Sequence, residues 1–121
     1  MLKEEKGFLN RLKEEFKNNP DIADILIFGS AARTNFEKYN DIDVLIVTKN
    51  PSNIMDELRK KLDANYISNE NFESDYWAGF SKKIRNKSKY HIFYISINEF
   101  NRGLHKRLSP VISLMNNQYY S

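Results

Sequence analysis

The stretch from Ile25 to Val47, ILIFGSAARTNFEKYNDIDVLIV, limits the possible folds of this chain more than any other segment. It contains two apolar runs, the first ending at Gly29 and the second following a pair of aspartates. Each run has the length of a strand, and its continuous apolar character is typical of strands that are covered on both faces. The residues between the runs fit a short helical turn and a polar loop. We therefore expect two buried strands joined by a compact connection.

Asp41 and Asp43 stand at the start of the second run, separated by Ile42. Because side chains alternate along a strand, the two carboxylates should face one side and Ile42 the other. Paired carboxylates form an all-oxygen site that suits Mg²⁺ or Mn²⁺. A solvated Asn-Asp turn would explain Asp41 alone. It would not explain Asp43, because an unpaired charge is costly within an otherwise buried run.

Gly29 and Ser30 lie where the first strand gives way to a helical turn. Such a turn offers backbone N–H groups and a hydroxyl to a phosphate. Taken singly, Gly29 would indicate a positive φ and Ser30 a helix cap. Arg33 follows closely and has two interpretations, a contact with a triphosphate or a surface arginine paired with Glu37. Beside a metal-binding pair of acids, the Gly-Ser turn favours a phosphate site.

These residues resemble the minimal nucleotidyltransferase family of the DNA polymerase β superfamily. The family signature is Gly-Ser, about ten residues and Asp-x-Asp, and here it stands as Gly29, Ser30, ten residues, Asp41 and Asp43. The resemblance implies an α/β (α+β) fold, in which a small mixed β-sheet backed by helices presents its acids along an open cleft. It also implies that Gly29, Ser30 and Arg33 contact the triphosphate of an NTP, and that the two aspartates bind metal ions.

The activity implied by this resemblance is metal-dependent transfer of a nucleoside monophosphate, in the first place AMP from ATP, to a hydroxyl group. Mg²⁺ or Mn²⁺ would be the cofactor. Small proteins of this type often resemble antitoxins that add AMP to a tyrosine of a HEPN-domain toxin, which makes a HEPN protein a candidate partner. A chain of 121 residues has little room for further domains that grip a template or tRNA. A protein or small-molecule hydroxyl is therefore favoured over nucleic acid as the acceptor.

The chain departs from the family at a third carboxylate, which the resemblance places on a later strand. The segment Tyr90–Ile95 reads as that strand and contains no Asp or Glu; the apolar alternation puts His91 at the expected position. A histidine adds no negative charge to a Mg²⁺ site, and His91 also fits an ordinary strand residue. Either Glu73, Asp75 or Glu99 supplies the missing acid, or catalysis is impaired. The second case predicts a weakened nucleotidyltransferase fold that binds nucleotide or a protein partner.

The net charge of +3 does not by itself indicate a nucleic-acid-binding protein. Basic residues nevertheless gather in two segments, which either form solvated helix faces or attract an NTP or an anionic acceptor. The first segment contains Lys82, Lys83, Arg85, Lys87 and Lys89, and the second contains Arg102, His105, Lys106 and Arg107.

The chain contains no cysteine, which excludes disulfides and thiolate metal sites. Its longest apolar runs have only the length of strands, so we expect no membrane span. The first residues carry mixed charges and lack the apolar segment of a signal peptide. We therefore expect a cytoplasmic protein with a single domain over residues 1–121.

Hydrophobic periodicity and turn residues predict the elements. Strands are expected at Ile22–Phe28, from Asp41 onwards, at Tyr90–Ile95 and within Asn65–Phe72. Helices are expected at Leu2–Asn18, from Pro51 or Ser52 to Ala64, and at Glu73–Asn86, Ile97–Leu108 and Val111–Asn117. The helix at 73–86 should turn inward the side chains of Tyr76, Trp77, Phe80 and Ile84. Tyr119 and Tyr120 are expected in a mobile tail.

Overall fold

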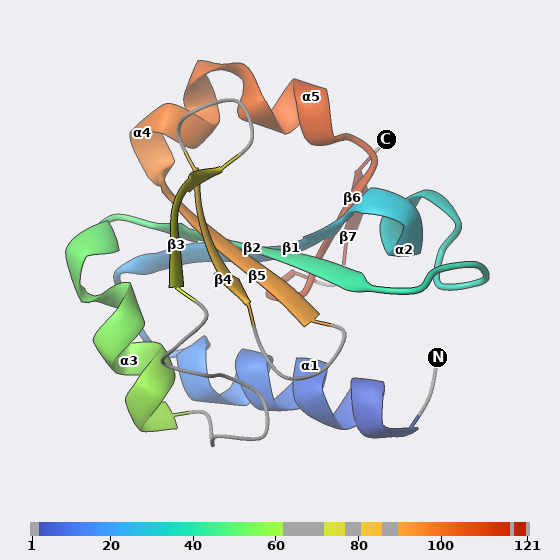
Figure 1. The fold of residues 1–121 in the computed structure, drawn as a ribbon, viewed down its shortest axis with the longest axis horizontal. Coiled ribbons are helices and arrows are strands. Elements are labelled where there is room, and N and C mark those ends of the chain that lie inside the picture. The colour runs from blue at the N-terminus through green and yellow to red at the C-terminus, as the bar shows by residue number, and fades with distance from the viewer. Residues whose placement is uncertain (1–2, 62–71, 77–80, 86–89, 117, 121) are drawn as a thin grey trace.

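A seven-stranded mixed sheet with helices on both faces forms the fold (Figure 1). The computed structural model describes residues 3–61, 72–76, 81–85, 90–116 and 118–120. The strand order is β3-β4-β5-β2-β1-β6-β7. The architecture confirms the α/β class and the mixed sheet that the sequence predicts. In the described part of the chain, no helix is both long enough and apolar enough to cross a membrane.

Three predicted strands form the centre of the sheet: β1 (Ile22–Phe28), β2 (Ile42–Thr48) and β5 (Tyr90–Ser96). β1 and β2 run antiparallel, whereas β2 and β5 run parallel. Successive residues of these strands alternate between two apolar layers, one on each face of the sheet. Both faces are therefore buried, which explains why the runs are apolar throughout instead of alternating with polar residues.

Helices cover both faces of the sheet (Figure 1). On one face lie α1 (Lys3–Phe16) and α3 (Ile54–Lys61), which the 3₁₀ turn η1 (Pro51–Asn53) precedes. On the other face the chain passes through α4 (Ile97–Glu99), the π-helical turn η3 (Phe100–Leu104) and α5 (His105–Leu108). The helix predicted at 97–108 is thus helical but kinked, because Gly103 adopts a φ of 135°.

The helix predicted at Glu73–Asn86 is wrong, because this part of the chain contains the strands β3 (Phe72–Tyr76) and β4 (Ser81–Arg85). They pair antiparallel with each other, and β4 pairs antiparallel with β5. β3, β4 and β5 are consecutive antiparallel strands; their pairing covers the free edge of β5, and this edge pairing overrides a weak local preference for helix. The predicted inward residues Trp77 and Phe80 lie outside the described residues, as do 65–71, where most of a further predicted strand falls.

The helix predicted at Val111–Asn117 is also wrong. The chain instead forms β6 (Val111–Ser113) and β7 (Gln118–Tyr120) around a turn. β6 pairs antiparallel with β1 and β7 pairs antiparallel with β6, so Tyr119 and Tyr120 belong to the sheet instead of a mobile tail. The Ser109-Pro110 peptide bond, which lies between α5 and β6, is cis.

Candidate functional site

The predicted Gly-Ser turn becomes the short helix α2 (Gly29–Arg33), which follows β1 without a loop. Phe28, the last residue of β1, pairs with Asp43 of β2, so the chain passes over that aspartate as it leaves the strand. Gly29 has a φ of +71°, and a Cβ at this position would collide with Oδ2 of Asp43. Only glycine satisfies both the backbone conformation and this close approach.

Ser30 lies in the first turn of α2, and the N-cap position is Phe28, which provides no side-chain cap. The predicted cap by Ser30 is therefore wrong, since the helix starts at Gly29, two residues before the start that a Ser30 cap would give. The first N–H groups of a helix have no acceptor within the helix. The N–H groups of Gly29 and Ser30 are accordingly available to bind an anion, together with the serine hydroxyl. In that case the Ser30 hydroxyl would bind a ligand instead of capping the helix.

The loop from α2 to β2 is held by specific contacts. The Thr34 hydroxyl donates to the Ser30 carbonyl at 2.8 Å and accepts the Lys38 N–H at 3.1 Å. Phe36, with a positive φ of 64°, donates its N–H to the Ala31 carbonyl at 2.7 Å. The Tyr39 hydroxyl donates to the fully buried Glu5 of α1. These bonds fix the path of the chain into the aspartate pair.

Asp41 and Asp43 open into one pocket, as strand alternation predicts, while Ile42 is buried in the apolar layer on the opposite face. The pocket measures about 530 Å³ and lies where β1 meets α2, beside the starts of β2 and β5. Its lining consists of Phe28, Gly29, Ser30, Arg33, Asn40, Asp41, Asp43, His91, Phe93, Arg107, Leu108 and Ser109. All predicted site residues therefore lie around one cavity.

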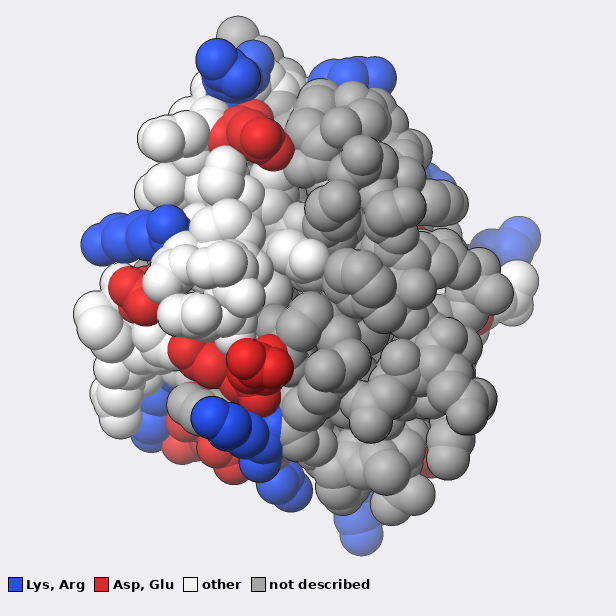
Figure 2. Space-filling view, turned by 60° about the vertical axis from the view of Figure 1, so that its left-hand side comes forward, with Lys and Arg blue, Asp and Glu red and all other residues white. Residues whose placement is uncertain are grey.

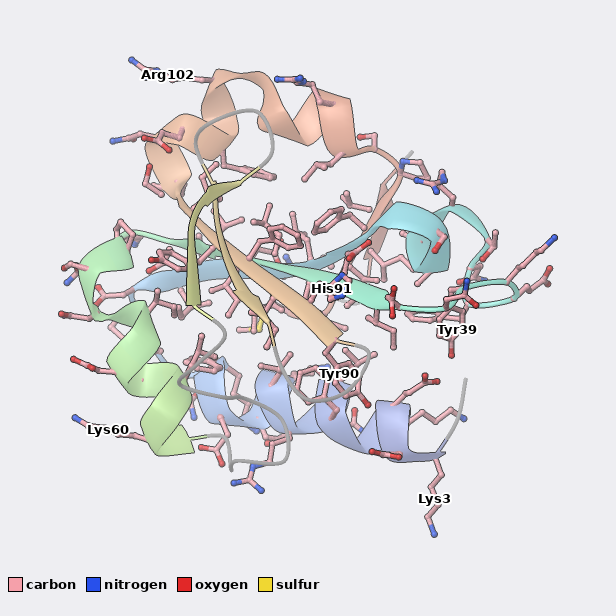
Figure 3. All side chains as sticks on the ribbon, viewed as in Figure 1. Lys3, Tyr39, Lys60, Tyr90, His91 and Arg102 are labelled. Atoms are coloured by element: carbon pink, nitrogen blue, oxygen red, sulfur yellow. The ribbon has the colours of Figure 1, made fainter. Side chains whose placement is uncertain are left out.

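His91 is the register partner of Asp43 across the parallel β2–β5 pair. Nδ1 of His91 lies 3.3 Å from Oδ1 of Asp43, and their side chains are 30% and 26% exposed. Figure 3 shows His91 at the end of β5 that lies near α2. The alternation of apolar residues along Tyr90–Ile95 thus correctly predicted that this imidazole lies beside the aspartate pair.

Comparison with protein families finds a match to the nucleotidyltransferase domain over residues 6–107. This chain belongs to that family. Among solved structures, the domain is similar to the conserved protein GrpB from Enterococcus faecalis, with a TM-score of 0.57 and 15% sequence identity. The alignment covers 84% of this chain and 58% of GrpB. Because the sequence identity is so low, the likeness concerns the fold alone. Comparison with curated proteins finds no match.

The three acids predicted as replacements in this nucleotidyltransferase domain stand at positions of the backbone that are distant from Asp43. Glu73 pairs with Lys83, three strands from Asp43, which corresponds to about 14 Å at ordinary strand spacing. Asp75 lies farther along β3. Glu99 follows the opposite end of β5, about 17 Å along the strand from His91. Within the described ranges, no three Asp, Glu, His or Cys side chains converge as a metal cluster.

Arg33 is exposed and lines the pocket; among the described residues it forms no ion pair with Glu37. Arg107 and Asn40 also line it, and neither is singled out as a site residue by the sequence motif. A second hollow of about 570 Å³ adjoins the pocket through Ser30, Arg33 and Asn40 and reaches Lys38. The arginines therefore approach the nucleotidyltransferase pocket from α2 and α5.

The two predicted basic segments have different positions in this domain. Of the second, Arg107 reaches the pocket, whereas Arg102 points outward from η3 (Figure 3). The first begins on β4 instead of a helix, and its members Lys87 and Lys89 lie outside the described residues. On the face in Figure 2, acidic and basic side chains of the described residues are interspersed.

Proposed function

We propose that this nucleotidyltransferase domain transfers AMP from ATP to a hydroxyl group, with the reaction in the pocket between α2 and the start of β2. One observation carries the proposal: Gly29, Ser30 and both aspartates line the same cavity, and the missing Cβ of Gly29 leaves room for the Asp43 carboxylate. A helix start of the kind that can bind phosphate and a pair of carboxylates that suit a metal ion are thus adjacent. That adjacency is what transfer of a nucleotide requires.

Asp41 and Asp43 would hold a divalent cation, Mg²⁺ or Mn²⁺. The donor set fits such an ion, because both carboxylates line an open pocket and Gly29 leaves Oδ2 of Asp43 uncovered by a Cβ. Metal ions at NTP sites are commonly held by one or two carboxylates plus substrate phosphates and water, so a cage of three protein side chains is not required. The cation would supply charge stabilisation to the phosphates.

The protein groups around the pocket would orient the nucleotide. The Gly29 and Ser30 amides and the serine hydroxyl would bind phosphate oxygens, and Arg33 and Arg107 would neutralise part of the triphosphate charge. In the reaction, the acceptor oxygen forms a bond to the α-phosphorus while the bond to the bridging oxygen breaks. Pyrophosphate leaves and the hydroxyl proton passes to solvent. Positioning and electrostatics account for most of the catalysis in such transfers.

The acceptor that we propose is a tyrosine hydroxyl of a HEPN-domain protein. The support is the sequence resemblance to antitoxins of this type, together with a pocket of about 530 Å³ that both aspartates line. Co-expression with a HEPN protein should give a complex and an AMP mass increment on one tyrosine. Absence of both would remove this acceptor from the proposal.

Calorimetric titration tests the site directly. The four NTPs are titrated, each with Mg²⁺ and with Mn²⁺, against wild type and the double variant Asp41→Asn/Asp43→Asn. The control Asp56→Asn changes an exposed aspartate on α3. We expect metal-dependent ATP binding in wild type and in the control, and its loss in the double variant. A folded wild type that binds no NTP with either metal would contradict the proposal.

A second function is a weakened domain that binds nucleotide or a partner without transfer. It is favoured by His91, which occupies the position beside Asp43 where the family resemblance implies a third carboxylate. Transfer of a radiolabelled AMP group separates the two functions. Nucleotide binding without any label transfer to a bound partner supports the binding role, and label transfer excludes it.

A further inference from the structure

Asp43 and His91 form a preorganised pair of unlike donors at the centre of the pocket. Their side chains extend from neighbouring parallel strands at the same register, so the sheet itself sets their separation. The 3.3 Å between Oδ1 and Nδ1 is slightly longer than most N–H···O hydrogen bonds, which span about 2.7–3.2 Å. Two adjacent ligands of an octahedral ion at about 2.1–2.2 Å stand about 3 Å apart. The pair therefore has nearly the spacing of two donors to one cation.

The surroundings leave this pair accessible and limit its movement. Both side chains are about one-quarter to one-third exposed toward the pocket. Gly29 lies directly over Oδ2 of Asp43, so that carboxylate has little freedom to turn toward α2. Phe28 and Phe93 line the same cavity and are 6% and 4% exposed, which makes one wall apolar. Burial of this kind strengthens an interaction between a donor pair and a cation.

The chemistry of the pair differs from that of two carboxylates. Mg²⁺ prefers oxygen donors and binds imidazole poorly, whereas first-row transition ions, of which Mn²⁺ is the weakest binder, accept an imidazole nitrogen more readily than Mg²⁺ does. Replacing an acid by histidine also removes one negative charge, which weakens the attraction for every divalent cation. For ions that bond well to nitrogen, the bond to the imidazole offsets this loss. We infer that Asp43 and His91 form a mixed oxygen–nitrogen site that selects a transition ion such as Mn²⁺ over Mg²⁺. The inference rests on the proposed function only for what the metal does in the reaction. That Asp43 and His91 bind a metal does not depend on the proposed function.

Electron paramagnetic resonance of bound Mn²⁺ tests this assignment without any activity measurement. A directly ligated imidazole gives a ¹⁴N coupling in pulsed spectra. The chain has two histidines, so the variants His91→Asp and His105→Gln form a matched pair. We expect the ¹⁴N coupling in wild type and in His105→Gln, and its loss in His91→Asp. Competition with Mg²⁺ should show that the ratio of Mn²⁺ to Mg²⁺ affinity falls roughly tenfold in His91→Asp.

Three results would overturn the inference. They are Mn²⁺ bound without ¹⁴N coupling, a coupling that persists in folded His91→Asp, and a metal preference that His91→Asp leaves unchanged. Circular dichroism of each variant establishes that it is folded. AMP transfer is measured separately with Mn²⁺: transfer in a protein whose bound Mn²⁺ shows no nitrogen coupling is the first of these results, and it would leave the proposed function intact. Mn²⁺ binding with a nitrogen coupling but without AMP transfer would support the inference and contradict the proposed function.

Discussion

Gly29 and Asp43 approach so closely that a single methyl group on residue 29 would occupy the space of the Asp43 carboxylate. The contact follows from the pairing of Phe28 with Asp43, which brings the first residue of α2 over the second strand. The glycine of the Gly-Ser motif therefore does more than permit a positive φ. It lets the first turn of α2 and the Asp43 carboxylate, which we propose bind phosphate and metal, share one small space.

Gly29→Ala should disrupt the site in two ways. The left-handed backbone costs about 1–2 kcal/mol for a residue with a Cβ, and the collision displaces the Asp43 carboxylate. We expect a lower free energy of unfolding and loss of metal-dependent NTP binding, measured by denaturant titration and calorimetry. Gly7→Ala is the control, because nothing lies within 4 Å of a Cβ there and alanine favours a helix by about 0.5–1 kcal/mol. Wild-type NTP binding in Gly29→Ala would contradict this account.

The centre of the fold and the core of the site are predictable from sequence because their signals are local. β1, β2 and β5 are continuous apolar runs, and such runs indicate strands buried on both faces. Alternation alone placed Asp41 and Asp43 on one face and His91 at the right register. The structure confirms each of these positions.

The edges of the sheet and the basic side of the pocket are not predictable in this way. β4 and β6 are short strands whose local patterns are ambiguous between strand and helix. Pairing decides them: β4 pairs with the next strand, β5, and β6 pairs with the distant β1. Arg107 reaches the pocket only because η3 and α5 lead the chain back toward β1. A basic helix in sequence gives no indication of which of its residues ends near the acids.

Arg33→Gln and Arg107→Gln should each weaken ATP binding. Both side chains line the pocket and both are exposed, so each contact with a triphosphate should contribute about 1 kcal/mol, or roughly a fivefold change in Kd, after allowance for solvent screening. Arg102→Gln removes an equal charge from η3, away from His91, and should leave Kd nearly unchanged (Figure 3). Calorimetry at two salt concentrations measures the difference. Equal effects of all three variants would show a general charge effect instead of direct contacts.

Asp24→Asn should stabilise the protein at neutral pH. Burial raises the pKa of Asp24 above its ordinary value of 3.8, although the Ser113 hydroxyl, which donates at 2.6 Å, and the Ile25 N–H oppose the shift. Between pH 3.8 and the raised pKa of Asp24, the folded state therefore binds more protons than the unfolded state. Wild-type stability should fall as pH rises through that window, and it should stay lower above it.

The asparagine variant retains an oxygen acceptor but has no carboxyl to ionise. Its stability advantage over wild type should be absent below pH 3.8 and should develop as pH rises through the raised pKa. Thermal unfolding at several pH values measures this advantage. Asp56→Asn controls for the loss of one charge on an exposed part of α3. An advantage that does not change with pH would contradict the assignment to Asp24 ionisation.

Tyr39→Phe should destabilise the fold and loosen the entry to the site. The Tyr39 hydroxyl donates to Glu5, which is fully buried on α1, and Tyr39 stands two residues before Asp41. Removing a donor from a buried charged acceptor costs about 1–3 kcal/mol. A double-mutant cycle with Glu5→Gln isolates the contact, since two residues in one hydrogen bond should show a coupling energy above about 0.5 kcal/mol. Denaturant unfolding of the four proteins measures the coupling, and a value near zero would show that this bond does not anchor the loop to α1.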